Sequence, residues 1–253
     1  MNNTVFSLLL TLIAGLSTMI GSLLIFVNKK NHNKIVIASL SFAAGVMITV
    51  SITDLIPESI ILLRSNLSEI STILISFLAV ILGVIISMLI DYYLPDKPKI
   101  ETKDSSLFKV GIISMVAIIM HNIPEGIATF VATNSDVSLG ISLTIAIAMH
   151  NIPEGISISI PIYYSTGSRK TALMYTFISA ISEPFGALLA LIFLKNYIND
   201  IILGILFSSI AGIMLQISFC ELLPAVKKYQ KNRKIKLVFF LLGAIFMLLK
   251  FTI

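Results

Sequence analysis

The hexapeptide HNIPEG occurs twice, at residues 121–126 and 150–155, and each copy lies inside a long apolar run. In both copies a histidine precedes a glutamate by four residues, a spacing that puts both side chains on one face of a helix. Imidazole nitrogen together with carboxylate oxygen suits zinc and neighbouring divalent transition metals better than calcium or magnesium. The pairs His121–Glu125 and His150–Glu154 are therefore candidate metal ligands.

The other residues of the motif support a site of this kind. Asn122 and Asn151 follow the histidines and add an amide oxygen to each copy. The proline of each motif has no N–H and displaces the carbonyl four residues earlier, while the glycine allows another helix to approach closely. A further acid, Glu183 in the segment ISEPFG, lies in the middle of another apolar run and could complete a second ion position.

The elements that position these residues are predicted to be membrane-spanning helices. The chain is 57% hydrophobic and 12% charged, with a mean hydropathy of +0.99. A hydrocarbon core of about 30 Å requires roughly 20 apolar residues per helix, and lipid offers the backbone no hydrogen bonds. We therefore expect an all-α integral membrane protein that forms a single transmembrane domain over residues 1–253. Its eight helices are expected at about 5–27, 35–62, 70–93, 107–132, 137–162, 171–194, 201–226 and 236–252.

The charges orient this protein in the membrane. Most of the 18 lysine and arginine residues lie in the odd-numbered loops between the expected spans, whereas the other side has only Arg64, Lys195 and Lys250. Because basic loops stay in the cytoplasm, both termini are expected on the outer side of the cytoplasmic membrane. The net charge of +5 is thereby explained as a topology signal, so nucleic-acid binding is not expected.

The duplicated motif also predicts an inverted repeat. Spans four and five are joined by a short loop and must run antiparallel, so the two copies are related by a two-fold axis in the membrane plane. A second pair, DLIPE at 54–58 and ELLPA at 221–225, also lies on helices of opposite direction. The pattern predicts a 3+2+3 arrangement with the metal site between helices four and five, as in secondary transporters. Its candidate pathway acids are Asp54, Glu58 and Glu221.

These motifs resemble those of the ZIP (Zrt/Irt-like) family of divalent metal transporters, most closely its bacterial ZupT-type branch. The resemblance covers essentially the whole chain, through HNIPEG in spans four and five, SEPFG in span six and the acid–proline motifs of spans two and seven. It implies a binuclear metal centre with two positions. The main transport site that it implies consists of His121, Glu125, His150 and Glu154. The second position consists of Asn122, Asn151 and Glu183, together with the two shared glutamates.

The sequence thus favours a carrier that takes up Zn2+, with Fe2+, Mn2+, Co2+ and Cd2+ as further candidate cargo. The metal is expected as the transported substrate and not as a cofactor, and the expected partners are divalent metal ions and the lipid bilayer, with a homodimer left open. One alternative is an intramembrane metal-dependent hydrolase, although a zincin helix carries two histidines around its glutamate and each motif here has one. A proton- or sodium-coupled carrier of another solute is a third interpretation.

Overall fold

The structure is a computed structural model that describes residues 3–27, 32–94, 101–194, 199–229 and 233–249, and these residues are almost entirely helical. Some long helices are continuous, and others change their winding along their length. The elements, in chain order, are α1 (Asn3–Ser22), η1 (Leu23–Phe26), α2 (His32–Val50), η2 (Ser51–Leu55), α3 (Ile56–Arg64), α4 (Glu69–Tyr93), α5 (Ser105–Ser135), α6 (Val137–Thr166), α7 (Arg169–Ala180), α8 (Ser182–Leu189), η3 (Ala190–Leu194), α9 (Asp200–Ile217), η4 (Ser218–Leu222), α10 (Leu223–Tyr229) and α11 (Arg233–Leu248).

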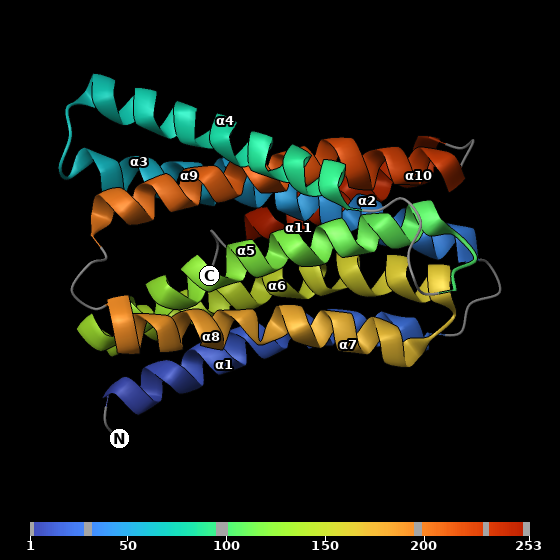
Figure 1. The fold of residues 1–253 in the computed structure, drawn as a ribbon, viewed down its shortest axis with the longest axis horizontal. Helices are drawn as coiled ribbons and strands as arrows, with labels where there is room; N and C mark the ends of the chain where they lie inside the picture. The colour runs from blue at the N-terminus through green and yellow to red at the C-terminus, as the bar shows by residue number, and fades with distance from the viewer. Residues whose placement is uncertain (1–2, 28–31, 95–100, 195–198, 230–232, 250–253) are drawn as a thin grey trace.

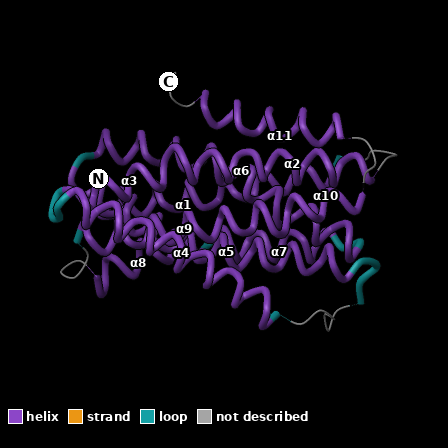
Figure 2. Tube along the Cα trace, turned by 90° about the horizontal axis from the view of Figure 1, so that it is seen from above, coloured by secondary structure: helices purple, strands orange, loops and turns teal. Residues whose placement is uncertain are grey.

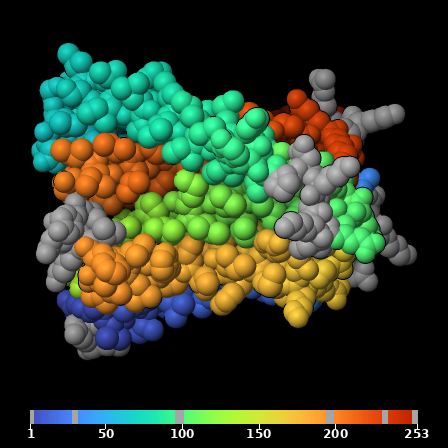
Figure 3. Space-filling model, viewed as in Figure 1, coloured from blue at the N-terminus to red at the C-terminus, as the bar shows by residue number. Residues whose placement is uncertain are grey.

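The helices run side by side along the long axis of the molecule and form two groups (Figure 1). The motif bundle contains the two HNIPEG helices, α5 and α6, packed against α1, α7 and α8. The companion bundle contains α2, α3, α4, α9, α10 and α11, with α11 packed mainly on α2 at one side of the molecule (Figure 2). In the space-filling view α5 lies between α9 above and α7 and α8 below (Figure 3).

A continuous apolar core joins the two bundles where α2 packs on α6. Leu40 and Met47 of α2 and Ile158 and Ile162 of α6 are all fully buried there. Many other large apolar side chains, particularly along α4, are exposed at the surface, as expected for helices that contact lipid. In the described part of the chain, seven helical stretches are long and apolar enough to cross a membrane.

These observations confirm the all-helical class. The expected eighth span, 236–252, corresponds to α11, of which the structure describes 16 residues, and residues 250–253 lie outside the described chain. Four expected spans each correspond to more than one element, because the winding changes at η1, η2, η3 and η4, and one residue, Ile181, separates α7 from α8. These are spans 5–27, 35–62, 171–194 and 201–226. The 3+2+3 arrangement and the single transmembrane domain remain predictions.

Close backbone contacts fix the motif helices against their neighbours. A Cβ atom added to Gly126 of α5 would lie only 1.9 Å from the carbonyl oxygen of Glu183 in α8. A Cβ atom added to Gly155 of α6 would lie 1.8 Å from the carbonyl oxygen of Thr18 in α1. The final glycine of each HNIPEG motif therefore sets how closely a third helix approaches the candidate site.

Candidate metal centre

A very short connection places the two motif copies side by side. Asp136 is both the C-cap of α5 and the N-cap of α6. Its carboxylate accepts hydrogen bonds from the backbone N–H groups of Ser138 and Leu139. This cap satisfies backbone donors at the start of α6 and allows the chain to reverse within one residue. The two helices then pack antiparallel, and both remain helical across Pro124 and Pro153.

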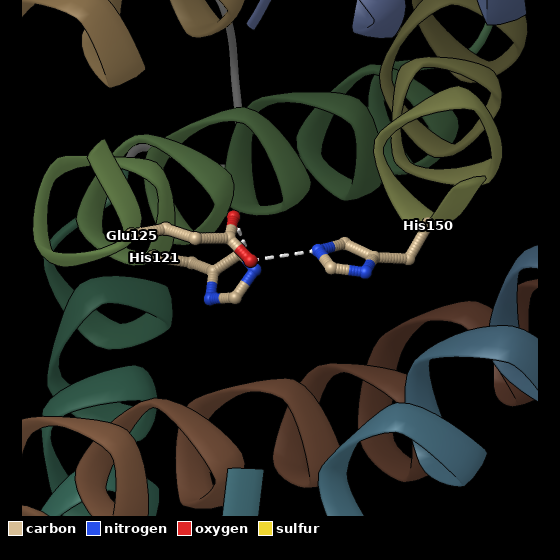
Figure 4. A group of neighbouring side chains, drawn as sticks. All are labelled: His121, Glu125 and His150. Atoms are coloured by element: carbon tan, nitrogen blue, oxygen red, sulfur yellow. Dashed lines mark hydrogen bonds and ion pairs between the residues drawn. The ribbon is translucent and has the colours of Figure 1, made fainter. Parts of the chain in front are cut away.

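Three side chains from the two motifs meet between α5 and α6 (Figure 4). Nε2 of His150 lies 2.8 Å from Oε1 of Glu125, and Nε2 of His121 lies 3.3 Å from Oε2 of the same carboxylate. The candidate ligand atoms of these three residues all lie within 4.8 Å of one another. Nε2 of His121 is also 3.6 Å from Oε1 of Glu154, so both motif glutamates face the same imidazole. Two histidines and two carboxylates are a donor set that suits zinc.

The cluster is buried among helices. His121 is 1% exposed and Glu154 is 0% exposed, whereas Glu125 and His150 retain 6% each. Within the described chain neither carboxylate oxygen of Glu154 has a hydrogen-bond partner. A buried carboxylate without hydrogen bonds is costly unless a cation or a proton compensates its charge. The site is therefore suited to a divalent cation that supplies this compensation.

The asparagines of the two motifs are held by their amide nitrogens. Nδ2 of Asn122 donates to the backbone carbonyl of Ser179 at 3.3 Å, and Nδ2 of Asn151 donates to the carbonyl of Ala14 at 3.0 Å and to Oε2 of Glu183 at 2.9 Å. Their Oδ1 atoms have no hydrogen-bond partner among the residues that the structure describes, and neither does Oε1 of Glu183. Amide and carboxylate oxygens of this kind are hard donor atoms that cations accept as ligands.

The candidate pathway acids lie outside this cluster, in helices of the companion bundle. Asp54 lies in the π-helical segment η2 and is close enough to His150 for a Coulombic interaction. Glu58 is one turn further along and is exposed. Glu221 lies in the π-helical segment η4 near Asp91 and Lys109, which are themselves joined by an ion pair. The structure thus brings Asp54 towards His150 and places Glu221 with a separate group of charges.

Two features of the site were not anticipated from the sequence. The π-helical turns η2 and η4 precede Pro57 and Pro224, whose missing N–H groups interrupt the regular pattern of helix hydrogen bonds. The carbonyls of Ala14 and Ser179 orient the motif asparagines. The sequence does contain a pattern that could have indicated these carbonyls. In spans one and six, the segments AGLSTMIG at 14–21 and SAISEPFG at 179–186 share a serine at the fourth position and a glycine at the eighth.

At the end of the molecule where α5 begins, charged residues link the two bundles. The carboxylate of Asp104 caps α5 at the N–H of Leu107 and accepts hydrogen bonds from Lys228 and Tyr229 of α10. Partial burial raises the pKa of Asp104, but the hydrogen bonds from Tyr229 and Lys228 outweigh this effect, and the pKa lies below its ordinary value of 3.8. Asp104 is therefore an ionised link between α5 and α10 at neutral pH.

Comparisons with known proteins agree with this geometry. The family model described as ZIP Zinc transporter matches residues 96–250, which include both HNIPEG motifs. The zinc transporter ZupT of Clostridium perfringens is 42% identical, over 92% of this chain and 90% of its own length. Those of Oceanobacillus iheyensis and Streptococcus mutans are 43% and 42% identical, over 91% and 88% of both chains, respectively. This chain, a multi-pass membrane protein with buried histidines and glutamates between two of its helices, belongs to the ZIP family.

Proposed function

We propose that this protein carries Zn2+ across the cytoplasmic membrane into the cytoplasm, with Fe2+, Mn2+, Co2+ and Cd2+ as further candidate cargo. The observation that carries this proposal is the sharing of Glu125 by His121 and His150, which come from two antiparallel copies of one motif. Relatives about 40% identical over about nine tenths of the chain are named zinc transporters, which favours transport over catalysis. The hydrolase alternative has no comparable support.

The proposed ligands fall into two positions. His121, Glu125, His150 and Glu154 hold the main cation, because their donor atoms converge in the buried cluster. Asn122, Asn151 and Glu183 offer further oxygens beside them. Asp54 serves the path to the main position, since its charge acts on His150. Glu58 and Glu221 serve the two ends of the path, because one is exposed and the other lies with Asp91 and Lys109.

The proposed orientation places the basic end of the molecule in the cytoplasm. Arg169 at the start of α7 lies over the ring of Phe26 at the end of the first span, and Lys228 of α10 contacts Asp104 at the start of α5. Two basic residues thus lie where helix ends of different spans meet. The opposite end joins Ser65 to Asp200 and Asn134 to Ser7. Under the positive-inside rule the first of these ends faces the cytoplasm, and the N-terminus lies outside.

Uptake of radiolabelled zinc tests this proposal in cells that express the protein at equal membrane levels. We expect uptake by the wild type and none above vector background for the double variant Glu125→Ala with Glu154→Ala. A matched control, Glu69→Ala with Glu101→Ala, removes two exposed acids and should transport like the wild type. Unlabelled metals added in competition give the order of preference. Wild-type cells that take up no more zinc than vector cells would overturn the proposal.

A further inference from the structure

The face that α1 presents to α6 repeats the face that α7 and α8 present to α5. The carbonyl of Ala14 accepts from the amide of one motif asparagine, and the carbonyl of Ser179 accepts from the amide of the other. Three residues later in each helix, Ser17 and Ser182 donate their hydroxyls back to these same carbonyls, both at 2.6 Å. A shift of 165 residues along the chain therefore relates Ala14 to Ser179 and Ser17 to Ser182.

The close backbone contacts follow the same shift. The carbonyl of Thr18 lies against Gly155 as the carbonyl of Glu183 lies against Gly126. Three residues further on, Gly21 lies against the carbonyl of Ile152, and Gly186 lies against that of Ile123; the added Cβ would be 2.0 Å away in both cases. Because four independent contacts share one register, Thr18 occupies the position in α1 that Glu183 occupies in α8.

The hydroxyl of Thr18 is buried and has no hydrogen-bond partner among the residues that the structure describes. Thr18 is 0% exposed, and its Oγ1 atom has no hydrogen bond to any part of the chain that is described. Several threonines of this protein, such as Thr49 and Thr176, donate to the carbonyl four residues earlier, whereas Thr72 and Thr129, like Thr18, have no partner among the described residues. For Thr18 that carbonyl belongs to Ala14, which already accepts from Ser17 and Asn151. A buried hydroxyl left in this way is costly unless another group satisfies it.

The register also identifies the contact that is missing. Glu183 accepts a hydrogen bond from Asn151, so the equivalent contact would join Thr18 to Asn122. The threonine side chain is shorter than that of glutamate, and Oδ1 of Asn122, like Oγ1 of Thr18, has no partner among the described residues. On one side of the centre the Asn151–Glu183 hydrogen bond links the asparagine to a carboxylate, and the remaining oxygens of both residues have no partner among the described residues. On the α1 side no such bond is formed in the described structure, and the oxygens of Asn122 and Thr18 without partners are both uncharged.

We propose that the hydroxyl oxygen of Thr18 binds the transported divalent cation, either directly or through a water of the cation's hydration shell. Thr18 lies at the counterpart of the Glu183 position. This inference rests on the proposed transport function. A neutral hydroxyl opposite a carboxylate makes the two halves of the centre unequal in charge, and the number of charged ligands tunes the affinity of a cation site. Thr18 thus completes the cation path on the α1 side without the tight hold of a second acid.

Zinc uptake kinetics of three variants test this assignment. Thr18→Val removes the hydroxyl at nearly constant volume, and Thr18→Ser keeps it. Thr11→Val is the matched control, because Thr11 is also fully buried in α1 but its hydroxyl already donates to the carbonyl of Leu8. We expect Thr18→Val to raise the KM for Zn2+ about fivefold at unchanged membrane level, the size of one lost polar contact. Thr18→Ser and Thr11→Val should retain the wild-type KM.

Thermal unfolding and direct zinc titration of the purified proteins guard against a folding defect. Without metal, Thr18→Val should be at least as stable as the wild type, because it removes an unsatisfied buried hydroxyl, and its zinc affinity should be weaker. The assignment is wrong if the KM of Thr18→Val equals that of the wild type, or if Thr18→Ser is impaired as strongly as Thr18→Val, which would indicate a packing role. An inactive wild type would remove the transport proposal and this inference with it. An active wild type with an unaffected Thr18→Val would remove the inference alone.

Discussion

Nε2 of His150 in α6 lies 2.8 Å from Oε1 of Glu125 in α5, so the two copies of the motif are joined by a side-chain contact between helices. The other oxygen of the same carboxylate lies 3.3 Å from His121. One carboxylate therefore serves both histidines. A cation held by these three residues must link α5 to α6, and its binding must depend on how the two helices are packed.

The first prediction concerns the charge of Glu154 and the stabilisation of the protein by zinc. Since Glu154 is fully buried and neither of its oxygens is hydrogen-bonded within the described structure, Glu154→Gln should stabilise the metal-free protein by about 1–3 kcal/mol. Zinc at a hundredfold excess over its Kd should stabilise the wild type by about 2.7 kcal/mol, and a chelator should reverse this. In Glu154→Gln the same zinc concentration should give much less stabilisation.

Thermal unfolding in detergent, with and without zinc, measures both effects. Glu69→Gln is the control, because Glu69 is exposed and pairs with Arg64 far from the motifs in sequence. Its response to zinc should equal that of the wild type. A metal-free Glu154→Gln protein that melts below the wild type would show that this carboxylate stabilises the fold.

The second prediction concerns the contact between α5 and α8. Gly126→Ala places a methyl group 1.9 Å from the carbonyl oxygen of Glu183, so the two backbones must separate. We expect a loss of about 1–3 kcal/mol in stability and a clear loss of zinc uptake, because Glu183 moves relative to the site. Gly204→Ala is the comparison, since the nearest atom to its added Cβ is Cγ of the buried Leu63, at 2.7 Å, and not a backbone oxygen of the candidate site. Equal uptake by Gly126→Ala and Gly204→Ala would contradict this expectation.

The third prediction concerns Asp104, which links α5 to Lys228 and Tyr229 of α10. Its pKa is below 3.8 in the folded protein, so its stabilising contribution is complete above that pH and is lost as the pH falls through the lower, folded-state value. Asp104→Asn keeps an N-cap acceptor for Leu107 and removes the charge. It should lower stability at pH 7 by about 1 kcal/mol, as expected for a partly exposed ion pair.

The difference in melting temperature between wild type and Asp104→Asn should be constant from pH 7 to pH 5 and should shrink below about pH 3.8. Asp136→Asn is a useful comparison, because Asp136 caps α6 through backbone N–H groups. If the difference in melting temperature between wild type and Asp104→Asn is unchanged at pH 3, the ionised carboxylate does not cause that difference.

The fourth prediction concerns external pH. Histidine and carboxylate ligands bind a cation only when deprotonated, so protons compete with zinc at His121, His150 and the motif glutamates. Uptake at subsaturating zinc should therefore fall as the external pH is lowered from roughly pH 7 to pH 5. Raising the zinc concentration at pH 5.5 should restore most of the rate. Uptake that stays flat over this range would argue against this ligand set.

The sequence alone determined which residues bear the chemistry and which class of fold carries them. Apolar runs of about 20 residues require helices in lipid, because the backbone must satisfy its own hydrogen bonds there, and the structure and family comparisons confirm the helical class and the family. The four-residue spacing of His121 and Glu125 also places both on one helix face by geometry alone, and their nitrogen and oxygen lie 3.3 Å apart. The assignment of all seven candidate ligands remains a prediction.

Only the tertiary structure decided how these residues meet. That His150 bonds Glu125 of the other motif, and that Asn151 bonds Glu183 across two helices, depends on the packing of α1, α6 and α8, which spacing along one chain segment does not specify. The features that single out Thr18 were equally hidden. Its type and its place in an apolar span are ordinary. In the described structure its hydroxyl has no partner, while Ser17 and Asn151 both donate to the Ala14 carbonyl that a threonine at this position could use. Competition for one acceptor between helices is a property of the folded protein.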